Sequence, residues 1–190
     1  ARPGNVLRFG EPRRGCRAYL ALAGGVDAAL VLGSRSSDVK AGLGVPPLRA
    51  GDRLGTRDGS GEGGEAPPPA PLEDEAALRV VPGPQDEAFT PADLAAFLSA
   101  AWTLGHESDR FGARLDGPRL TPLGSGEIAS DGLVPGCVQV PPDGRPIVAL
   151  AEGPTTGGYP KIATVVAADV ARLAQLVPGR GRLRFELAGR

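Results

Sequence analysis

The residues best suited to chemistry lie in one short stretch, residues 153–161, which reads Gly-Pro-Thr-Thr-Gly-Gly-Tyr-Pro-Lys. Its side chains that can bind or react are two hydroxyls, a phenol and an amine, on Thr155, Thr156, Tyr159 and Lys161. The glycine pair, Gly157 and Gly158, lets the backbone approach a ligand closely, because glycine reaches backbone angles closed to other residues. Prolines on either side of the tyrosine stiffen the bend. The combination is typical of a turn that contacts a ligand.

Lys161 is one of only two lysines among the 21 lysines and arginines of the chain. A lysine amine can act as a base, or as a cation it can stabilise a developing oxyanion. The alternative is a tight turn that merely leads into a strand, with Lys161 pointing into water. The stretch is not a nucleotide P-loop, because the order Gly-x-x-x-x-Gly-Lys-Ser/Thr is absent.

Three further residues could complete a site around Lys161 and Tyr159, which are the predicted catalytic residues. Arg110 and Arg114 carry guanidinium forks that suit a carboxylate. Gln139, together with the threonine hydroxyls, could bind an amide or ureido group. The alternative for the two arginines is that they are surface residues of a strand.

A second polar loop contains Ser34, Arg35 and Asp38 and is a candidate secondary site. The competing interpretation is a helix cap, because Ser and Asp side chains accept hydrogen bonds from free backbone amides. No catalytic set of the Ser-His-Asp or Cys-His kind is recognisable, since His106 is the single histidine. The two cysteines lie far apart in the sequence, so we predict no metal site.

The bulk composition argues against several classes of protein. The net charge of −1 disfavours a protein that binds nucleic acid by neutralising phosphates, and 4% aromatic residues disfavour base stacking. No apolar run is long enough to cross a bilayer, and no signal sequence is recognisable, which predicts a cytoplasmic location. The chain has no methionine, even at position 1, so we expect it to be part of a longer protein.

The sequence predicts a mainly β fold with a few helices. Its 29 glycines and 20 prolines, with 41% hydrophobic residues, are typical of short strands joined by tight turns. Strands are expected at 5–9, 16–23, 48–54, 77–81, 138–140, 147–150, 161–167 and 183–187. A helix should start at Thr90-Pro91 with an apolar face that reaches Trp102, and Asp169 should open or cap a second one. Two helices are too few for a doubly wound sheet, so we predict a closed or partly closed barrel.

Five blocks of sequence together resemble one bacterial family. They include Gly-Gly-Val-Asp, Gly-Ser-Arg-Ser-Ser-Asp, Ser-Asp-Arg-Phe-Gly-Ala-Arg-Leu-Asp-Gly-Pro and Gln-Val-Pro-Pro-Asp-Gly-Arg-Pro-Ile, and they span residues 17–27, 32–38, 108–118, 135–147 and 155–163. The chain resembles the family of 5-oxoprolinase C subunits, also called allophanate hydrolase subunit 2, biotin-dependent carboxyltransferase or KipA-like proteins. The resemblance covers nearly the whole chain.

The resemblance implies cyclophilin-like β-barrel units and a partner of the B type, the KipI-like or allophanate hydrolase subunit 1 protein. With a further partner of the A type, such proteins form an ATP-dependent 5-oxoprolinase that opens pyroglutamate to glutamate. Two alternatives stay open: the carboxyltransferase part of a biotin-dependent urea carboxylase, and a regulator that binds a KipI-like kinase inhibitor without chemistry. No cofactor is expected on this chain alone, with ATP used in the complex and biotin in the carboxyl-transfer alternative.

The chain also departs from the family pattern. Family members begin with a further segment that carries two motifs absent here, and they have Met and Tyr where this chain has Phe111 and Ala113. We therefore expect residues 1–58 to be the C-terminal part of an incomplete N-terminal β domain. Residues 59–75, rich in Pro, Gly and Glu, should be a linker or insertion. Residues 76–190 should form the cyclophilin-like barrel domain.

Overall fold

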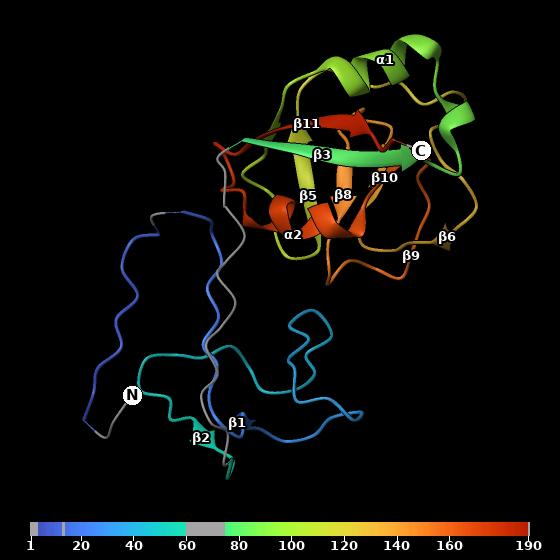
Figure 1. Ribbon diagram of the computed structural model, residues 1–190. Coiled ribbons are helices and arrows are strands. Elements are labelled where there is room, and N and C mark those ends of the chain that lie inside the picture. Colours follow the sequence, from blue (N-terminus) through green and yellow to red (C-terminus); the bar gives the residue numbers. More distant parts are fainter. Residues whose placement is uncertain (1–3, 13, 60–74, 190) are drawn as a thin grey trace. The chain divides into compact units, whose positions relative to one another are not determined.

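The computed structural model describes residues 4–12, 14–59 and 75–189 (Figure 1). The chain divides into two compact units. The first, called the barrel unit here, comprises residues 1–17 and 69–190, and the second, called the loop unit, comprises residues 18–68. Apart from its two end residues, the predicted linker at 59–75 lies outside the described residues.

Seven strands of the barrel unit form a closed barrel in the order β10-β3-β11-β4-β5-β8-β7. All neighbours are antiparallel except β3 and β11, which are parallel. The strands are β3 (Glu75–Pro82), β4 (Trp102–Leu104), β5 (Gly112–Asp116), β7 (Cys137–Gln139), β8 (Ile147–Ala149), β10 (Lys161–Val165) and β11 (Arg182–Leu187). The predicted mainly β, barrel-containing fold is confirmed.

The remaining elements are short. A 3-10 helix, η1 (Asp86–Ala88), precedes α1 (Pro91–Ser99), and α2 (Ala167–Gln175) links β10 to β11. In Figure 1 the two α-helices lie on opposite sides of the barrel strands. Two small antiparallel sheets are formed by β1 (Val26–Asp27) with β2 (Gly55–Thr56) and by β6 (Asp131–Gly132) with β9 (Thr156–Gly157).

Alternate strand residues fill the barrel. Ala113, Val148 and Val138 are aligned across β5, β8 and β7, and all three are buried. The intervening residues point to the outer face, because successive side chains of a strand alternate between its faces. Three aromatic residues close the interior near α1. The ring centroids of Phe97 and Phe185 stack 4.3 Å apart, and Trp102 is fully buried.

Several predicted elements are wrong. Residues 5–9, 16–23 and 48–54 form no strands, and the loop unit contains only the two-residue pair β1–β2 among its described residues. An alternating pattern predicts a strand only if a neighbour takes up its backbone hydrogen bonds, and these segments have no such neighbour in the ranges that the structure describes. The helix that starts at Thr90 also ends earlier than expected, at Ser99, and Trp102 begins β4 instead.

The start of α1 is confirmed and carries a capping box. The Thr90 hydroxyl accepts a hydrogen bond from Asp93 N–H at 3.1 Å, while the Asp93 carboxylate accepts from the Thr90 backbone at 3.2 Å. The hydrogen bond from the Thr90 hydroxyl holds the pKa of Asp93 below its usual value. The cap therefore satisfies amides that the first helical turn leaves without partners.

We predict that Thr90→Ala lowers the free energy of unfolding by about 1 kcal/mol, because it removes the capping acceptor. Urea unfolding followed by circular dichroism measures this change. Thr121→Ala is the control, since only the backbone N–H of Thr121 reaches Asp93. A loss as large from Thr121→Ala as from Thr90→Ala would contradict the capping role.

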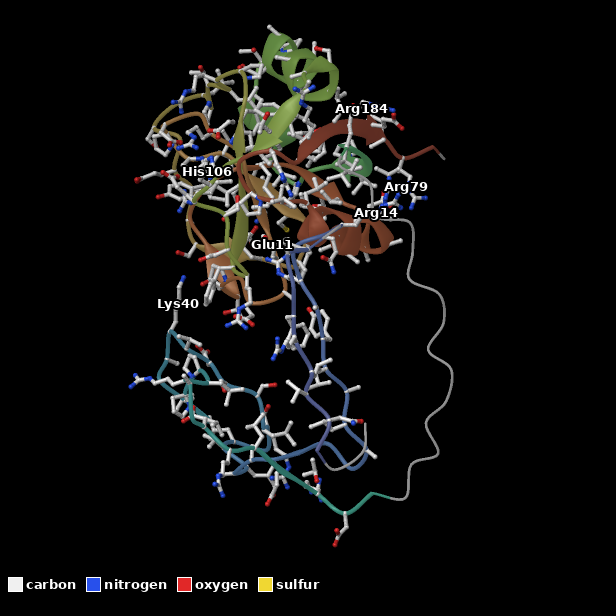
Figure 2. The ribbon with its side chains drawn as sticks, turned by 90° about the vertical axis from the view of Figure 1, so that its left-hand side faces the viewer. Glu11, Arg14, Lys40, Arg79, His106 and Arg184 are labelled. Carbon is white, nitrogen blue, oxygen red and sulfur yellow. The ribbon has the colours of Figure 1, made fainter. Side chains whose placement is uncertain are left out.

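An ion pair between buried Asp169 and half-exposed Arg79 fixes α2 against the barrel. Asp169 in the first turn of α2 is 3% exposed, and its carboxylate accepts from the backbone N–H, Nε and Nη2 of Arg79 on β3, each at 2.9 Å. The Arg79 side chain is half-exposed on the outside of the barrel, as is that of Arg184 on the neighbouring β11 (Figure 2).

Candidate functional site

Lys161, the first residue of β10, is buried rather than exposed to water. Its side chain is 2% exposed, and Nζ forms an ion pair with the Asp131 carboxylate of β6. Nζ also donates to the Gly132 carbonyl at 3.3 Å. A lysine is rarely buried unless it is paired. The alternative in which Lys161 points into water is therefore wrong, and its amine instead forms a buried, paired charge.

Sequence reasoning missed two partners of Lys161, namely Asp131 and Gln85. The Lys161 N–H donates to Gln85 Oε1 at 3.3 Å, and Gln85 Nε2 donates to Asp131 Oδ2 at 3.4 Å. The hydrogen bond from the lysine amine is the main cause that holds the pKa of Asp131 below its usual value, with the Gly132 N–H and the lysine charge adding to it. Asp131 sits in a Ser-Asp-Gly sequence typical of an ordinary turn, so no local signal marked it.

A flap covers the lysine. We define the flap as residues 128–133 and 155–160, which include β6 and β9. Its two segments are joined by hydrogen bonds from Leu133 N–H to the Thr155 carbonyl and from Ile128 N–H to the Gly158 carbonyl, both at 2.9 Å. In Figure 1 it lies beside the barrel, next to β10. The flap thus places residues 155–160, which belong to the stretch first singled out in the sequence, over the amine of Lys161, the last residue of that stretch.

The hydroxyl-bearing residues of the flap are exposed, in contrast to Lys161. Thr155, Thr156 and Tyr159 are exposed, so their hydroxyl-bearing side chains reach the flap surface while the amine lies beneath. Gln139, on the neighbouring β7, is paired directly with Lys161 across the strands, and its Nε2 donates to the Tyr159 carbonyl at 3.1 Å. Gln139 therefore ties the flap to the barrel.

A side chain would crowd its neighbours at Gly157 but not at Gly158. A Cβ on Gly157 would lie 2.5 Å from Gln139 Nε2 and 2.8 Å from the Leu133 side chain, whereas one on Gly158 would meet only the Ile128 carbonyl, at 3.5 Å. The first glycine of the pair lets the flap lie flat on Gln139, and the second tolerates a methyl group.

We predict that Gly157→Ala loosens the flap and that Gly158→Ala does not. Hydrogen exchange measures this at two amides, Leu133 N–H and Ile128 N–H, which bridge the flap segments. Exchange at both should accelerate in Gly157→Ala, because the methyl group displaces β9 from Gln139, while barrel amides stay protected. Equal protection of the two amides in both variants would contradict the tight fit.

The structure does not bring the two predicted arginines into contact with Lys161. Arg114 aligns with Ile147, Ile147 with Gln139 and Gln139 with Lys161, so they form one row on the outer face of four strands. Three strand spacings separate the ends of the row, or roughly 14 Å. Arg110 precedes β5 and forms a half-exposed ion pair with Glu152 at 3.2 Å.

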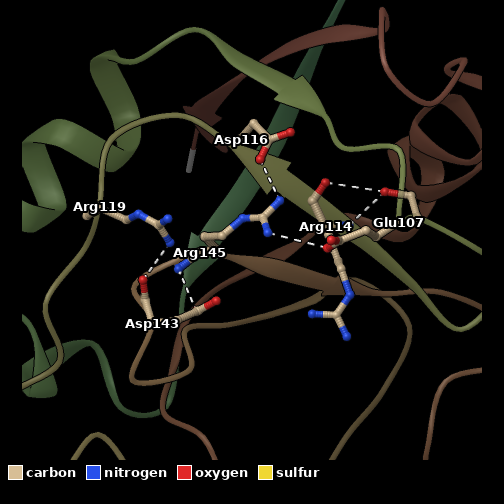
Figure 3. A network of polar contacts seen from close by, with 7 residues as sticks. Glu107, Arg114, Asp116, Arg119, Asp143 and Arg145 are labelled. Atoms are coloured by element: carbon tan, nitrogen blue, oxygen red, sulfur yellow. Dashed lines mark hydrogen bonds and ion pairs between the residues drawn. The ribbon is translucent and has the colours of Figure 1, made fainter.

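Arg114 lies instead beside a second charged network (Figure 3). At its centre, Arg145 pairs with Asp116 at 2.5 Å and with Glu107 at 3.3 Å. The hydrogen bond with Asp116 holds the pKa of Arg145 above its usual value. The Arg114 guanidinium points away from these carboxylates in Figure 3 and is solvent-exposed.

The secondary loop residues lie in the loop unit. Ser34 accepts a hydrogen bond from Ser36 N–H at 3.1 Å, and Asp38 accepts one from Ala41 N–H at 2.9 Å. Arg35 Nη1 donates to the Ala28 carbonyl. Within the described residues, no helix begins at or directly after positions 34–38, so the helix-cap alternative is wrong and the contacts instead stabilise turns.

The geometry at Lys161 offers a donor and an acceptor side by side. The ammonium can donate to an oxygen that gains negative charge, and the Asp131 carboxylate can accept an N–H. Gln85 and Gln139 add amide groups at the edge. Within the described ranges, no cluster of three His, Cys, Asp or Glu side chains could hold a metal ion, and no helix is long and apolar enough to cross a membrane.

Comparison with known proteins places the chain in a family. The model described as "Carboxyltransferase domain, subdomain A and B" matches residues 1–187. The C subunit of 5-oxoprolinase from Escherichia coli K12 is 41% identical over 180 residues, which make up 93% of this chain and 58% of that protein. The chain thus spans less than two thirds of the length of this curated relative.

Solved structures agree with this placement. The crystal structure of TTHA0988 matches with a TM-score of 0.81 and 38% identity over 94% of this chain and 35% of that one. The urea amidolyase of K. lactis matches with a TM-score of 0.82 and 26% identity over 93% of this chain and 12% of that one. The resemblance drawn from the five sequence blocks is confirmed: this chain belongs to the carboxyltransferase-domain family, subdomains A and B, and is similar to the 5-oxoprolinase C subunit.

Proposed function

We propose that this chain is part of a 5-oxoprolinase component that opens pyroglutamate to glutamate at the Lys161 site. In this proposal it acts with the A and B subunits of the enzyme, the latter a KipI-like or allophanate hydrolase subunit 1 protein, and the complex uses ATP. Similarity to the 5-oxoprolinase C subunit supports the assignment. The observation that carries it is the ion pair between the buried Lys161 amine and the half-exposed Asp131 carboxylate of the flap.

A cyclic amide is chemically complementary to this pair. The lactam ring of pyroglutamate presents one carbonyl oxygen and one N–H on adjacent atoms. The Lys161 ammonium would donate to the carbonyl oxygen, and Asp131 would accept the N–H. When a nucleophile attacks the carbonyl, negative charge develops on that oxygen, and a preorganised cation stabilises it most in the transition state.

The flap would complete the site. Opening it would expose Lys161 to the ligand, and closing it again would cover the ring and exclude water. Arg110 is our candidate for binding the pyroglutamate carboxylate. Its half-exposed pairing with Glu152 is weak enough to be exchanged for a substrate.

A second function, carboxyl transfer to urea in a biotin-dependent system, is favoured by a specific observation. A urea amidolyase has the same fold over 93% of this chain. Urea also presents a carbonyl oxygen next to N–H groups, so the Lys161–Asp131 pair would fit it as well. In this alternative, biotin would be carried by another part of the enzyme.

Reconstitution tests the assignment. The full-length protein would be combined with its A and B partners, and ATP-dependent formation of glutamate from pyroglutamate would be followed. A parallel assay would supply urea, bicarbonate and a biotinylated partner. We expect glutamate formation; turnover of urea alone would favour carboxyl transfer. Stable partner binding without either activity would contradict both and favour the regulatory alternative.

A further inference from the structure

Gln85 joins the barrel to the flap beside Lys161. Its side-chain oxygen accepts a hydrogen bond from the Lys161 N–H at 3.3 Å, and its amide nitrogen donates to Asp131 Oδ2 at 3.4 Å. All three residues belong to the barrel unit, whose seven strands close on themselves. The amide therefore contacts both members of the charged pair, one through its backbone and the other through its carboxylate.

A close approach of two backbone segments places Gln85 there. Gly83 follows β3, and its N–H donates to the Ile162 carbonyl of β10 at 3.0 Å. A Cβ at Gly83 would overlap the Lys161 carbonyl, so a glycine is needed for the two segments to come this close. Gln85 lies two residues further on and directly precedes η1. The same contact that joins the end of β3 to β10 thus brings the Gln85 side chain to Lys161.

The two hydrogen bonds fix which way the Gln85 amide points. An amide has an acceptor oxygen on one side and an NH₂ donor on the other. The Lys161 backbone N–H only donates, and an ionised Asp131 carboxylate only accepts. The observed orientation satisfies both partners, whereas the flipped amide would satisfy neither.

The Asp131 carboxylate is held by donors on both of its oxygens. Oδ2 accepts from the Lys161 amine and from Gln85, and Oδ1 accepts from the Gly132 N–H at 2.7 Å. Donors that face a carboxylate favour its ionised form, which has no proton to give. Asp131 is therefore presented as a hydrogen-bond acceptor.

The lengths of the two contacts indicate a role in orientation rather than in stability. At 3.3 and 3.4 Å, both exceed the usual range of N–H···O hydrogen bonds. Gln85 is also only half-buried. Its loss should therefore cost the fold little, while it removes the one amide that reaches from the barrel to the carboxylate of Asp131.

We propose that Gln85 is a positioning residue that holds the Asp131 carboxylate beside the Lys161 amine as an acceptor, and so selects ligands with an N–H next to their carbonyl group. A ring with a methylene group or an oxygen in place of the N–H would leave the carboxylate without this hydrogen bond. The site thus takes lactams in preference to cyclic ketones and lactones. The choice of ligand rests on the function proposed above, whereas the positioning of Asp131 does not.

Hydrogen exchange of the full-length protein, followed by mass spectrometry, tests the positioning of Asp131. In Gln85→Leu, peptides from the flap should exchange about fivefold faster, because a contact that flap opening must break is gone. Peptides from α1 and β11 should keep their rates. Glu87→Gln, at an exposed position in η1, is the control and should leave flap exchange unchanged.

Gln85→Glu adds a pH-dependent rescue that a purely structural role would not give. At neutral pH the introduced carboxylate would face Asp131 and the Lys161 N–H, with Asp86 and Glu87 next to it in the chain. Repulsion from Asp131 should then open the flap. The neighbouring acids raise the pKa of the introduced group above the usual 4.3 or so and outweigh the single Lys161 cation, so it takes up a proton towards about pH 5.

The protonated group of Gln85→Glu again offers a carbonyl to the Lys161 N–H and a donor to Asp131, as the amide does. Its flap exchange, divided by that of the unsubstituted protein at the same pH, should therefore fall back towards one on acidification. Gln85→Leu has no such group and should show no rescue.

Ligand binding to the reconstituted complex tests the selection. Without ATP, the complex should bind pyroglutamate about tenfold more tightly than its carbocyclic analogue, in which a methylene group replaces the ring N–H. In Gln85→Leu the two affinities should converge, because the acceptor is no longer held in place. Isothermal titration measures both.

Two results would overturn the proposal. The first is flap exchange in Gln85→Leu equal to that of the unsubstituted protein, or an open flap in Gln85→Glu that acid does not close. The second is an undiminished preference of Gln85→Leu for pyroglutamate over the analogue. A complex that binds neither compound would instead contradict the function proposed above, and the exchange measurements would still decide the role of Gln85.

Discussion

Lys161→Met in the full-length protein is expected to slow ATP-dependent pyroglutamate hydrolysis by its complex about 100-fold or more, the usual loss when a preorganised donor to an oxyanion is removed. Methionine keeps most of the aliphatic stem in the buried space and removes the charge. The Asp131 side chain is 52% exposed, so water can hydrate it after its partner is gone. The fold and partner binding should therefore persist.

The matched control is Lys40→Met, which removes the only other lysine of this chain. It should leave turnover unchanged. Co-purification with the partners should be equal in both variants, so that a loss of activity reports on the site and not on assembly. Wild-type turnover in Lys161→Met would exclude Lys161 as the group that stabilises the reacting carbonyl.

The stability of the protein should depend on pH through Asp169. Its three hydrogen bonds from Arg79 are the main cause that lowers the Asp169 pKa from 3.8 to about 2. Because the folded state binds this proton less readily, the carboxylate contributes stability that is complete above pH 3.8 and is lost as the pH falls towards 2. The shift corresponds to about 2 kcal/mol.

Asp169→Asn should therefore lower the free energy of unfolding by about 2 kcal/mol at neutral pH. The difference between the variant and the unsubstituted protein should shrink towards zero near pH 2. Urea unfolding at a series of pH values measures this difference directly and cancels the titration of the other acids. Glu186→Gln, in an exposed pair with Arg184, should change little at any pH. A constant difference for Asp169→Asn from pH 7 to pH 2 would contradict the shifted pKa.

Local signals in the sequence predicted those elements whose cause is local. Thr90 and Pro91 marked the start of α1, and the Pro-Pro-Asp-Gly turn marked the β7–β8 hairpin. The parallel pairing of β3 with β11 could not be predicted, because it joins residues near 78 and 185 through the barrel. The segments at 5–9 and 16–23 show the converse, since they alternate like strands but have no pairing in the described structure.

The candidate site was predictable in part, because only one of its segments is marked by a local signal in the sequence. Residues 153–161 stood out because reactive side chains and glycines are dense there, and the fold places them over the amine of Lys161. Asp131 could not be found, since 30 residues separate it from Lys161 and only the pairing of β6 with β9 brings it close. Arg114 illustrates a further limit. It shares the outer face of the barrel with Lys161, but three strand spacings separate the two residues.

The most direct test of the central claim is a crystal structure of the complete complex with pyroglutamate bound. We expect the lactam oxygen at about 3 Å from Lys161 Nζ and the lactam N–H directed at Asp131, with the flap closed over the ring. Pyroglutamate bound elsewhere, with the flap still sealing an unchanged Lys161–Asp131 pair, would contradict the account.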